Sequence, residues 1–179
     1  MLTNDSFVIE EPGALLHTIR PLVRLLLFAN GPEVEPVQAL AHDLKWSVEH
    51  LSHPSELSDN FVPDDQTAAL VMTHNFGRDL VALDRLLPLR LPYLGLLGPR
   101  KRHAELLAQL QEYRELRSSW IENLYAPGGL DIGSEAPEEI ALSIVSEVTA
   151  VLSKRCGGFL RDRLRAIHSD QSQSIEHAA

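Results

Sequence analysis

Three cationic residues, Arg100-Lys101-Arg102, stand together directly after the apolar stretch YLGLLGP in a chain that is acidic overall. The free backbone N–H groups at the start of a helix favour an anion, and cationic side chains at that point strengthen the preference. We interpret Arg100 and Lys101 as an anion site that suits a phosphate. The alternative, that the run is only a solvated helix face, stays open on spacing alone.

The residues around Gly31 argue against an ordinary dinucleotide site. The usual fingerprint after a first strand is G-x-G-x-x-G, which places a pyrophosphate at the start of the next helix. Here the stretch reads Ala29-Asn30-Gly31-Pro32-Glu33-Val34 and keeps one glycine. Glu33 and Glu35 would repel a phosphate at that helix start. We therefore expect no tight NAD binding.

Histidine and cysteine offer no clear metal or nucleophile site. His50 and His53 are three residues apart, which on a strand points their side chains to opposite faces, and His74 lies on a different segment. Zinc needs three or four ligands, so we assign no metal site. Cys156, the single cysteine, has no evident His/Asp partner and is expected to pack at the end of the last helix. We assign no catalytic residue.

Short apolar runs alternate with helical patterns along the chain. Continuous apolar runs bounded by glycine or proline are typical of strands buried on both faces. The predicted strands are 24–29, 47–52, 68–73, 93–97 and 122–126, and the predicted helices are 34–45, 79–87, 100–116 and 137–152. This alternation predicts an α/β fold, a doubly wound Rossmann-like parallel sheet with helices on both faces. We expect the strand order 3-2-1-4-5, with the fourth strand beside the first.

Ligands of such sheets bind at the carboxyl ends of the strands. Those ends carry Asn30-Gly31, Ser52-His53, Thr73-His74-Asn75, Gly98 and Gly128-Gly129. The Thr73–Asn75 segment either contacts a ligand or caps the helix that follows it. Both interpretations place it at the mouth of the same crevice.

Composition limits the classes of function. The chain has 179 residues, 44% of them hydrophobic, which suits one globular domain with its own core. Its net charge of −9 argues against broad nucleic-acid binding. One cysteine excludes an intrachain disulfide, and we expect a reducing, cytoplasmic location. The sequence shows no secretory signal and no apolar run long enough to cross a membrane.

Three blocks of sequence together resemble a known family. They are residues 71–76 with Asp79, residues 93–98 with the cationic run, and residues 126–133 continuing into PEEIALSI at 137–144. The chain is similar over residues 24–160 to the C-terminal Rossmann domain of the xanthine dehydrogenase accessory factor family, the XdhC/CoxI type. The glycine-rich turn followed by Asp-Ile-Gly and Pro-Glu-Glu-Ile-Ala is the most specific of the blocks.

The resemblance implies a maturation role rather than catalysis. Members of the family bind molybdenum cofactor (molybdopterin or its nucleotide form), assist its sulfuration with a cysteine desulfurase, and deliver it to a molybdenum hydroxylase such as xanthine dehydrogenase. Arg100 and Lys101 would then hold the cofactor phosphate, and the glycines at 128 and 129 would let the backbone approach the flat pterin. Asp131 would accept hydrogen bonds from pterin amines, or cap a turn before Pro137. A second copy of the chain, forming a homodimer, is a further candidate partner.

The full set of cofactor-binding residues predicted in this way comes from the strand ends and the turns after them. They are Asn30, Gly31, Thr73, His74, Asn75, Gly98, Arg100, Lys101, Gly128, Gly129 and Asp131.

The sequence departs from the family at two places. The family's Gly-Ala-Gly turn is Ala29-Asn30-Gly31 here, and its charged pair after the second strand is replaced by Ser52-His53-Pro54. Members commonly carry an N-terminal domain, for which we see no room. We predict a linker at 1–20, the Rossmann domain at 21–168 and a flexible tail at 169–179. An NAD(P)-dependent oxidoreductase and a ligand-free interaction module are the alternative functions.

Overall fold

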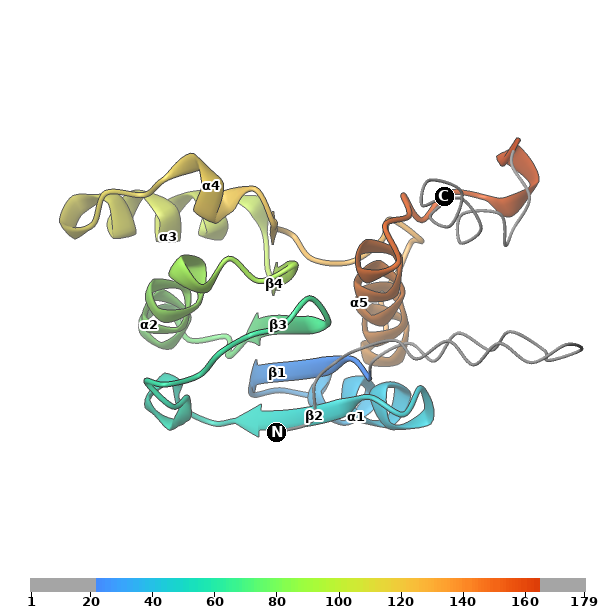
Figure 1. Cartoon of the computed structure of the whole chain (residues 1–179), viewed down its shortest axis with the longest axis horizontal. Helices are drawn as coiled ribbons and strands as arrows, with labels where there is room; N and C mark the ends of the chain where they lie inside the picture. Colours follow the sequence, from blue (N-terminus) through green and yellow to red (C-terminus); the bar gives the residue numbers. More distant parts are fainter. Residues whose placement is uncertain (1–21, 165–179) are drawn as a thin grey trace, which may run out of the picture.

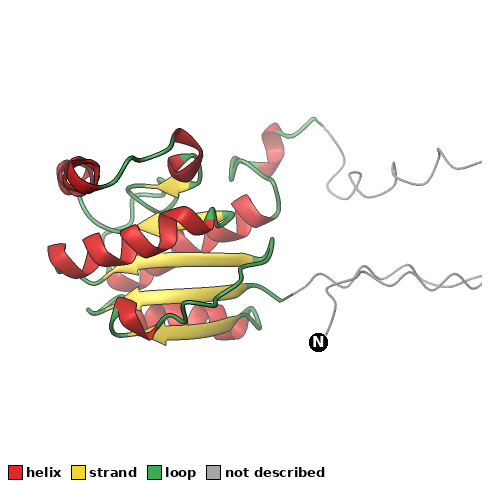
Figure 2. Cartoon of the chain, turned by 60° about the vertical axis from the view of Figure 1, so that its left-hand side comes forward, coloured by secondary structure: helices red, strands yellow, loops and turns green. Residues whose placement is uncertain are grey.

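The computed structural model describes residues 22–164, and they form a five-stranded sheet with helices on both faces (Figures 1 and 2). The strands are β1 (Arg24–Ala29), β2 (Ser47–Leu51), β3 (Thr67–Met72), β4 (Tyr93–Leu96) and β5 (Leu124–Tyr125). All neighbouring strands pair in parallel. The predicted α/β fold class is confirmed, and the predicted strand ranges agree with the structure to within two residues at either end.

Four long helices cover the sheet, two on each face. They are α1 (Val34–Asp43), α2 (Phe76–Leu86), α3 (Arg100–Tyr113) and α5 (Pro137–Leu152), and a short helix α4 (Ser118–Ile121) precedes β5. Helices α2 and α3 lie on one side of the sheet, with α1 and α5 on the other (Figure 1). None of the helices in the described part of the chain is long and apolar enough to cross a bilayer.

The strand order is β2-β1-β3-β4-β5, and the predicted order 3-2-1-4-5 is therefore wrong. β4 lies beside β3, which separates it from β1. Both orders satisfy right-handed crossovers, so apolar runs alone could not distinguish them. β2 lies on one side of β1, and β3, β4 and β5 follow on the other side. Because the order of the strands reverses at β1, α1 and α2 pack on opposite faces of the sheet.

The core has two layers, because β1 and β3 alternate their side chains between the faces. Leu26 and Phe28 pack toward α2 and α3, whereas Leu25 and Leu27 pack toward α1 and α5. Each strand of this central pair is buried along almost its whole length. The predicted linker at 1–20 and tail at 169–179 lie outside the described residues, as do the ends of the predicted domain.

His103, on α3, is a polar residue inside the core. It is only 4% exposed, and its Nε2 lies 3.6 Å from the Cβ position that a side chain at Gly98 would occupy. Within residues 22–164 neither ring nitrogen has a hydrogen-bond partner. Burial lowers the pKa of His103 because it disfavours the charged imidazolium, and the nearby backbone of Leu97 and Ala126 opposes part of that shift.

We predict that His103 makes the protein less stable as the pH falls from 7 to 5. The unfolded chain takes up a proton near the ordinary histidine pKa of about 6.5. The folded chain resists that proton until a lower pH, so the unfolded state binds more protons in this window and the free energy of unfolding decreases. Thermal unfolding at pH 7 and pH 5 should show a smaller loss of Tm in His103→Leu than in the wild type.

His42 provides the control, because it is an exposed histidine at the end of α1. His42→Leu should keep the pH dependence of the wild type. Equal losses of Tm in the wild type and in His103→Leu would show that the buried imidazole does not carry the effect.

Candidate functional site

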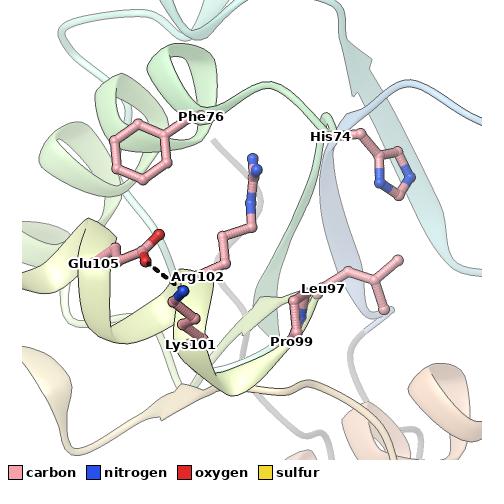
Figure 3. Close-up of a pocket in the computed structure, with 8 residues that line it drawn as sticks. His74, Phe76, Leu97, Pro99, Lys101, Arg102 and Glu105 are labelled. Carbon is pink, nitrogen blue, oxygen red and sulfur yellow. Dashed lines mark ion pairs between the residues drawn. The ribbon is translucent and has the colours of Figure 1, made fainter.

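An open pocket lies at the carboxyl edge of the sheet, between the turn that follows β3 and the turn that follows β4. Its volume is about 410 Å³. It is lined by His74, Phe76, Leu97, Gly98, Pro99, Lys101, Arg102 and Glu105, and Figure 3 shows them around the Arg102 side chain. Apolar walls, the cations Lys101 and Arg102 and the Glu105 carboxylate therefore meet in one depression.

Asp79 connects the two sides of this pocket through hydrogen bonds. Its carboxylate is 1% exposed, and Oδ1 accepts hydrogen bonds from the backbone N–H of Thr73 (3.2 Å) and from the Thr73 hydroxyl (2.5 Å). Oδ2 accepts a hydrogen bond from Nη2 of Arg102 at 2.5 Å, which links α2 to α3. A buried charge needs such partners, because a carboxylate left unpaired at that depth is costly. Thr73, predicted as a ligand contact, thus directs its hydroxyl at Asp79.

The side chain of His74 lies over the turn that follows β1. The residue has a left-handed backbone (φ 55°), and its ring lies away from Phe76 in Figure 3. Nε2 lies 3.3 Å from Oε2 of Glu33 and 2.9 Å from the Cβ position at Gly31. The side chains of His74 and Glu33 consequently occupy the space over Gly31. An anion at this turn would meet the Glu33 carboxylate, which is only 12% exposed.

The predicted residues fall into two groups. His74, Gly98 and Lys101 line the pocket. Asn75 caps α2, since its Oδ1 accepts a hydrogen bond from the backbone N–H of Arg78 at 3.0 Å, as the capping alternative predicted. The remaining residues do not line this pocket; they are Asn30, Gly31, Thr73, Asn75, Arg100, Gly128, Gly129 and Asp131. Their role in cofactor binding stays a prediction.

The glycines after β5 lie close to side chains of the protein itself. A Cβ at Gly129 (φ 115°) would lie 2.5 Å from the Ser143 hydroxyl, and one at Gly128 would lie 3.2 Å from the Tyr93 hydroxyl. Oε2 of Glu147, on α5, accepts hydrogen bonds from the Tyr93 hydroxyl and the Gly129 N–H, both at 2.8 Å. Burial raises the pKa of Tyr93 well above its usual value, and the Glu147 carboxylate adds to the shift.

The three cations of the 100–102 run differ strongly in exposure. Arg100 is exposed and lies outside the pocket lining. Lys101 lines the pocket with a side chain that is 89% exposed, and its Nζ lies 3.9 Å from Oε1 of Glu105. Arg102 also lines the pocket and is only 24% exposed. Sequence reasoning favoured the first two cations and missed Arg102, although at about 100° per residue Arg102 is only about 40° from the buried Leu106 on α3.

No metal cluster is found in residues 22–164, where no three His, Cys, Asp or Glu side chains could jointly hold an ion. His50 contacts the backbone oxygen of Ala29 at 3.0 Å, and His53 caps the short helical turn at Pro54–Glu56.

Cys156 is exposed, so the expectation that it packs against the helix end is wrong. The chain passes beyond the end of α5 before it reaches Cys156, which leaves no layer to cover the thiol.

Comparison with known proteins connects this fold to one family. The model of the XdhC Rossmann domain matches residues 25–148. The chain is 31% identical over 159 residues to a probable xanthine dehydrogenase subunit of Bacillus subtilis (strain 168), and the match covers 78% of this chain and 46% of that protein. It is 27% identical over 132 residues to the molybdenum cofactor insertion chaperone PaoD of Escherichia coli (strain K12), covering 74% and 41% respectively.

A solved structure gives the same result. The fold matches a crystal structure described as a xanthine dehydrogenase from Bacillus halodurans with a TM-score of 0.65 and 28% identity, over 77% of this chain and 46% of that one. The chain thus spans less than half the length of these relatives. Because the family model extends from β1 into α5 and includes every strand of the sheet, the chain belongs to the XdhC Rossmann-domain family.

Proposed function

We propose that this protein binds molybdenum cofactor at the carboxyl edge of its sheet and assists insertion of that cofactor into a molybdenum hydroxylase. Membership of the XdhC Rossmann-domain family supports this role. So do relatives that are named as a molybdenum cofactor insertion chaperone and as part of a xanthine dehydrogenase. The cofactor is the cargo of such a protein, and no catalytic group is required of the chain.

The observation that carries the proposal is the chemistry of the pocket between the β3 and β4 turns. Phe76 and Leu97 provide apolar surface on either side of the Arg102 side chain, and Lys101 stands at the rim (Figure 3). Molybdopterin combines a flat pterin with a phosphate, so it presents both an apolar face and an anion. Ligand pockets typically measure about 300–1,000 Å³, and this one falls within that range.

The finer steps of the proposal come from the family resemblance. A cysteine desulfurase would supply sulfur to the cofactor while this protein holds it, and a molybdenum hydroxylase such as xanthine dehydrogenase would receive it. An open pocket suits such a role, because a carrier must release its cargo to the next protein. The pocket between the β3 and β4 turns is open to solvent, which would allow that exchange.

We predict that the protein, produced in cells that make molybdenum cofactor, retains cofactor after purification. The Lys101→Glu variant should retain about tenfold less, because it replaces a cation at the pocket rim with an anion that repels the phosphate. The measurement is the pterin fluorescence released on oxidative denaturation, divided by the protein concentration. Wild-type protein without bound pterin would contradict the proposed function.

Lys45→Glu is the matched control. Lys45 is exposed and precedes β2, so it lies at the opposite edge of the sheet, and its replacement makes the same change in net charge. This variant should retain cofactor as the wild type does. An equal loss in both variants would indicate that overall charge, rather than the pocket, controls retention.

We predict further that calorimetric titration with NADH or NADPH gives no saturable binding in the micromolar range. The space over Gly31, where a dinucleotide phosphate would lie, is occupied by His74 and flanked by the Glu33 carboxylate. A saturable titration curve with a defined stoichiometry would instead support the oxidoreductase alternative. The Glu33→Gln variant would then separate the contribution of charge from that of shape.

A further inference from the structure

Arg102 occupies the middle of the pocket. Its side chain extends from the first turn of α3 between Phe76 and His74, and its guanidinium carbon lies 5.7 Å from the centre of the Phe76 ring (Figure 3). The side chain is three-quarters shielded from solvent. A ligand that enters between the β3 and β4 turns therefore meets this cation in a partly desolvated place, where charge interactions are stronger than at the open surface.

Asp79 fixes the direction of the guanidinium. Nη2 donates to Oδ2 of Asp79, and this is the only hydrogen bond of the Arg102 side chain within the described residues. Asp79 is itself held through Oδ1 by the N–H and hydroxyl of Thr73. A guanidinium has five N–H donors in a rigid fork, so the donors not turned toward Asp79 remain available to an oxyanion. Fixed in this way, the fork loses little entropy when it binds.

The neighbouring cations lack this fixed geometry. Lys101 is 89% exposed and is weakly paired with Glu105, and Arg100 is exposed outside the pocket. Exposed charges on long side chains gain little from pairing, because water screens them and because ordering the side chain costs entropy. Arg102 is thus the residue best placed to hold an anion firmly, although its sequence neighbours carry the same charge.

The shape of the site selects one phosphate on one flat ring. Phe76, Leu97 and Pro99 offer apolar surface for a ring, and the volume of about 410 Å³ suits a single ring system. A second phosphate would have to reach toward the β1 turn, where Glu33 and His74 occupy the space over Gly31. The site therefore favours a phosphomonoester over a diphosphate-linked nucleotide.

We propose that the Arg102 guanidinium, positioned by Asp79, binds the phosphate of a flat-ringed phosphomonoester in this pocket. The inference rests on the proposed function, in which that ligand is the pterin phosphate of the cofactor. Arg102 is the contact residue, and Asp79 and Thr73 act through it as positioning residues.

The test compares two fluorescent pterins, neopterin monophosphate and neopterin, by titration against the wild type and Arg102→Lys. The wild type should bind the phosphorylated pterin about ten- to a hundredfold more tightly. Arg102→Lys keeps the charge but loses the fork, so it should lose most of this preference while its affinity for neopterin is unchanged. A purely structural role of Arg102 would weaken the binding of both pterins equally.

Arg90→Lys is the matched control, because Arg90 is exposed and precedes β4 at the opposite edge of the sheet, and it should keep the preference of the wild type. Because Arg102→Lys leaves Asp79 in a changed environment, a second variant combines Asp79→Asn with Arg102→Gln, which removes both charges and keeps two hydrogen-bonding groups. With its Tm checked, this double variant should bind the two pterins alike. Inorganic phosphate is the third probe, and it should compete only weakly because it lacks the ring.

The outcomes separate this inference from the proposed function. Purified protein that retains molybdenum cofactor while Arg102→Lys keeps the wild-type preference would overturn the role of Arg102 and leave the function standing. Protein without cofactor that still binds neopterin monophosphate through Arg102 would overturn the function and leave the phosphate site. The inference also fails if the wild type shows no preference for the phosphorylated pterin, or if inorganic phosphate binds as tightly as the pterin phosphate.

Discussion

The buried carboxylate of Asp79 is the interaction on which the carboxyl edge of this sheet depends. An unpaired charge at that depth would be far too costly, so the positions of Thr73 and Arg102 follow from the need to satisfy it. Thr73 directly follows β3, and Arg102 lies in the first turn of α3. One side chain on α2 therefore fixes the relative position of three segments, and the pocket is the space that they leave between them.

The strand order decides where that pocket lies. With β3 between β1 and β4, the start of α3 lies next to the Thr73–Asn75 turn instead of the Gly31 turn. The left-handed backbone of His74 turns its ring toward Glu33 and over Gly31, which closes the position that dinucleotide-binding folds use for a phosphate. The pocket at this edge lies one strand further along, where Lys101 and Arg102 line it together with Glu105.

Much of the fold could be predicted from local pattern, since a strand such as RLLLFA is apolar along most of its length and is bounded by Gly31 and Pro32. The strand order could not, because it depends on which side of β1 the chain returns to after α1. Helical spacing also places Asp79 on the buried stripe of α2, so a buried carboxylate in need of a cation could have been predicted. The identity of that cation could not be predicted, because Asp79 and Arg102 are 23 residues apart and only the folded sheet brings them together.

Asp79 has a counterpart on the opposite face of the sheet, the Glu147 carboxylate. Asp79 accepts from the N–H and hydroxyl of Thr73 on the α2 side, and Glu147 accepts from the Gly129 N–H and the Tyr93 hydroxyl on the α5 side. Each ties a turn at the carboxyl edge to the helix that packs beneath it. A displacement of either helix would therefore move a turn at this edge, because the turn is hydrogen-bonded to a side chain of that helix. The geometry of the edge is thus set by the packing of the core, which is how a surface pocket obtains fixed positions for its polar groups.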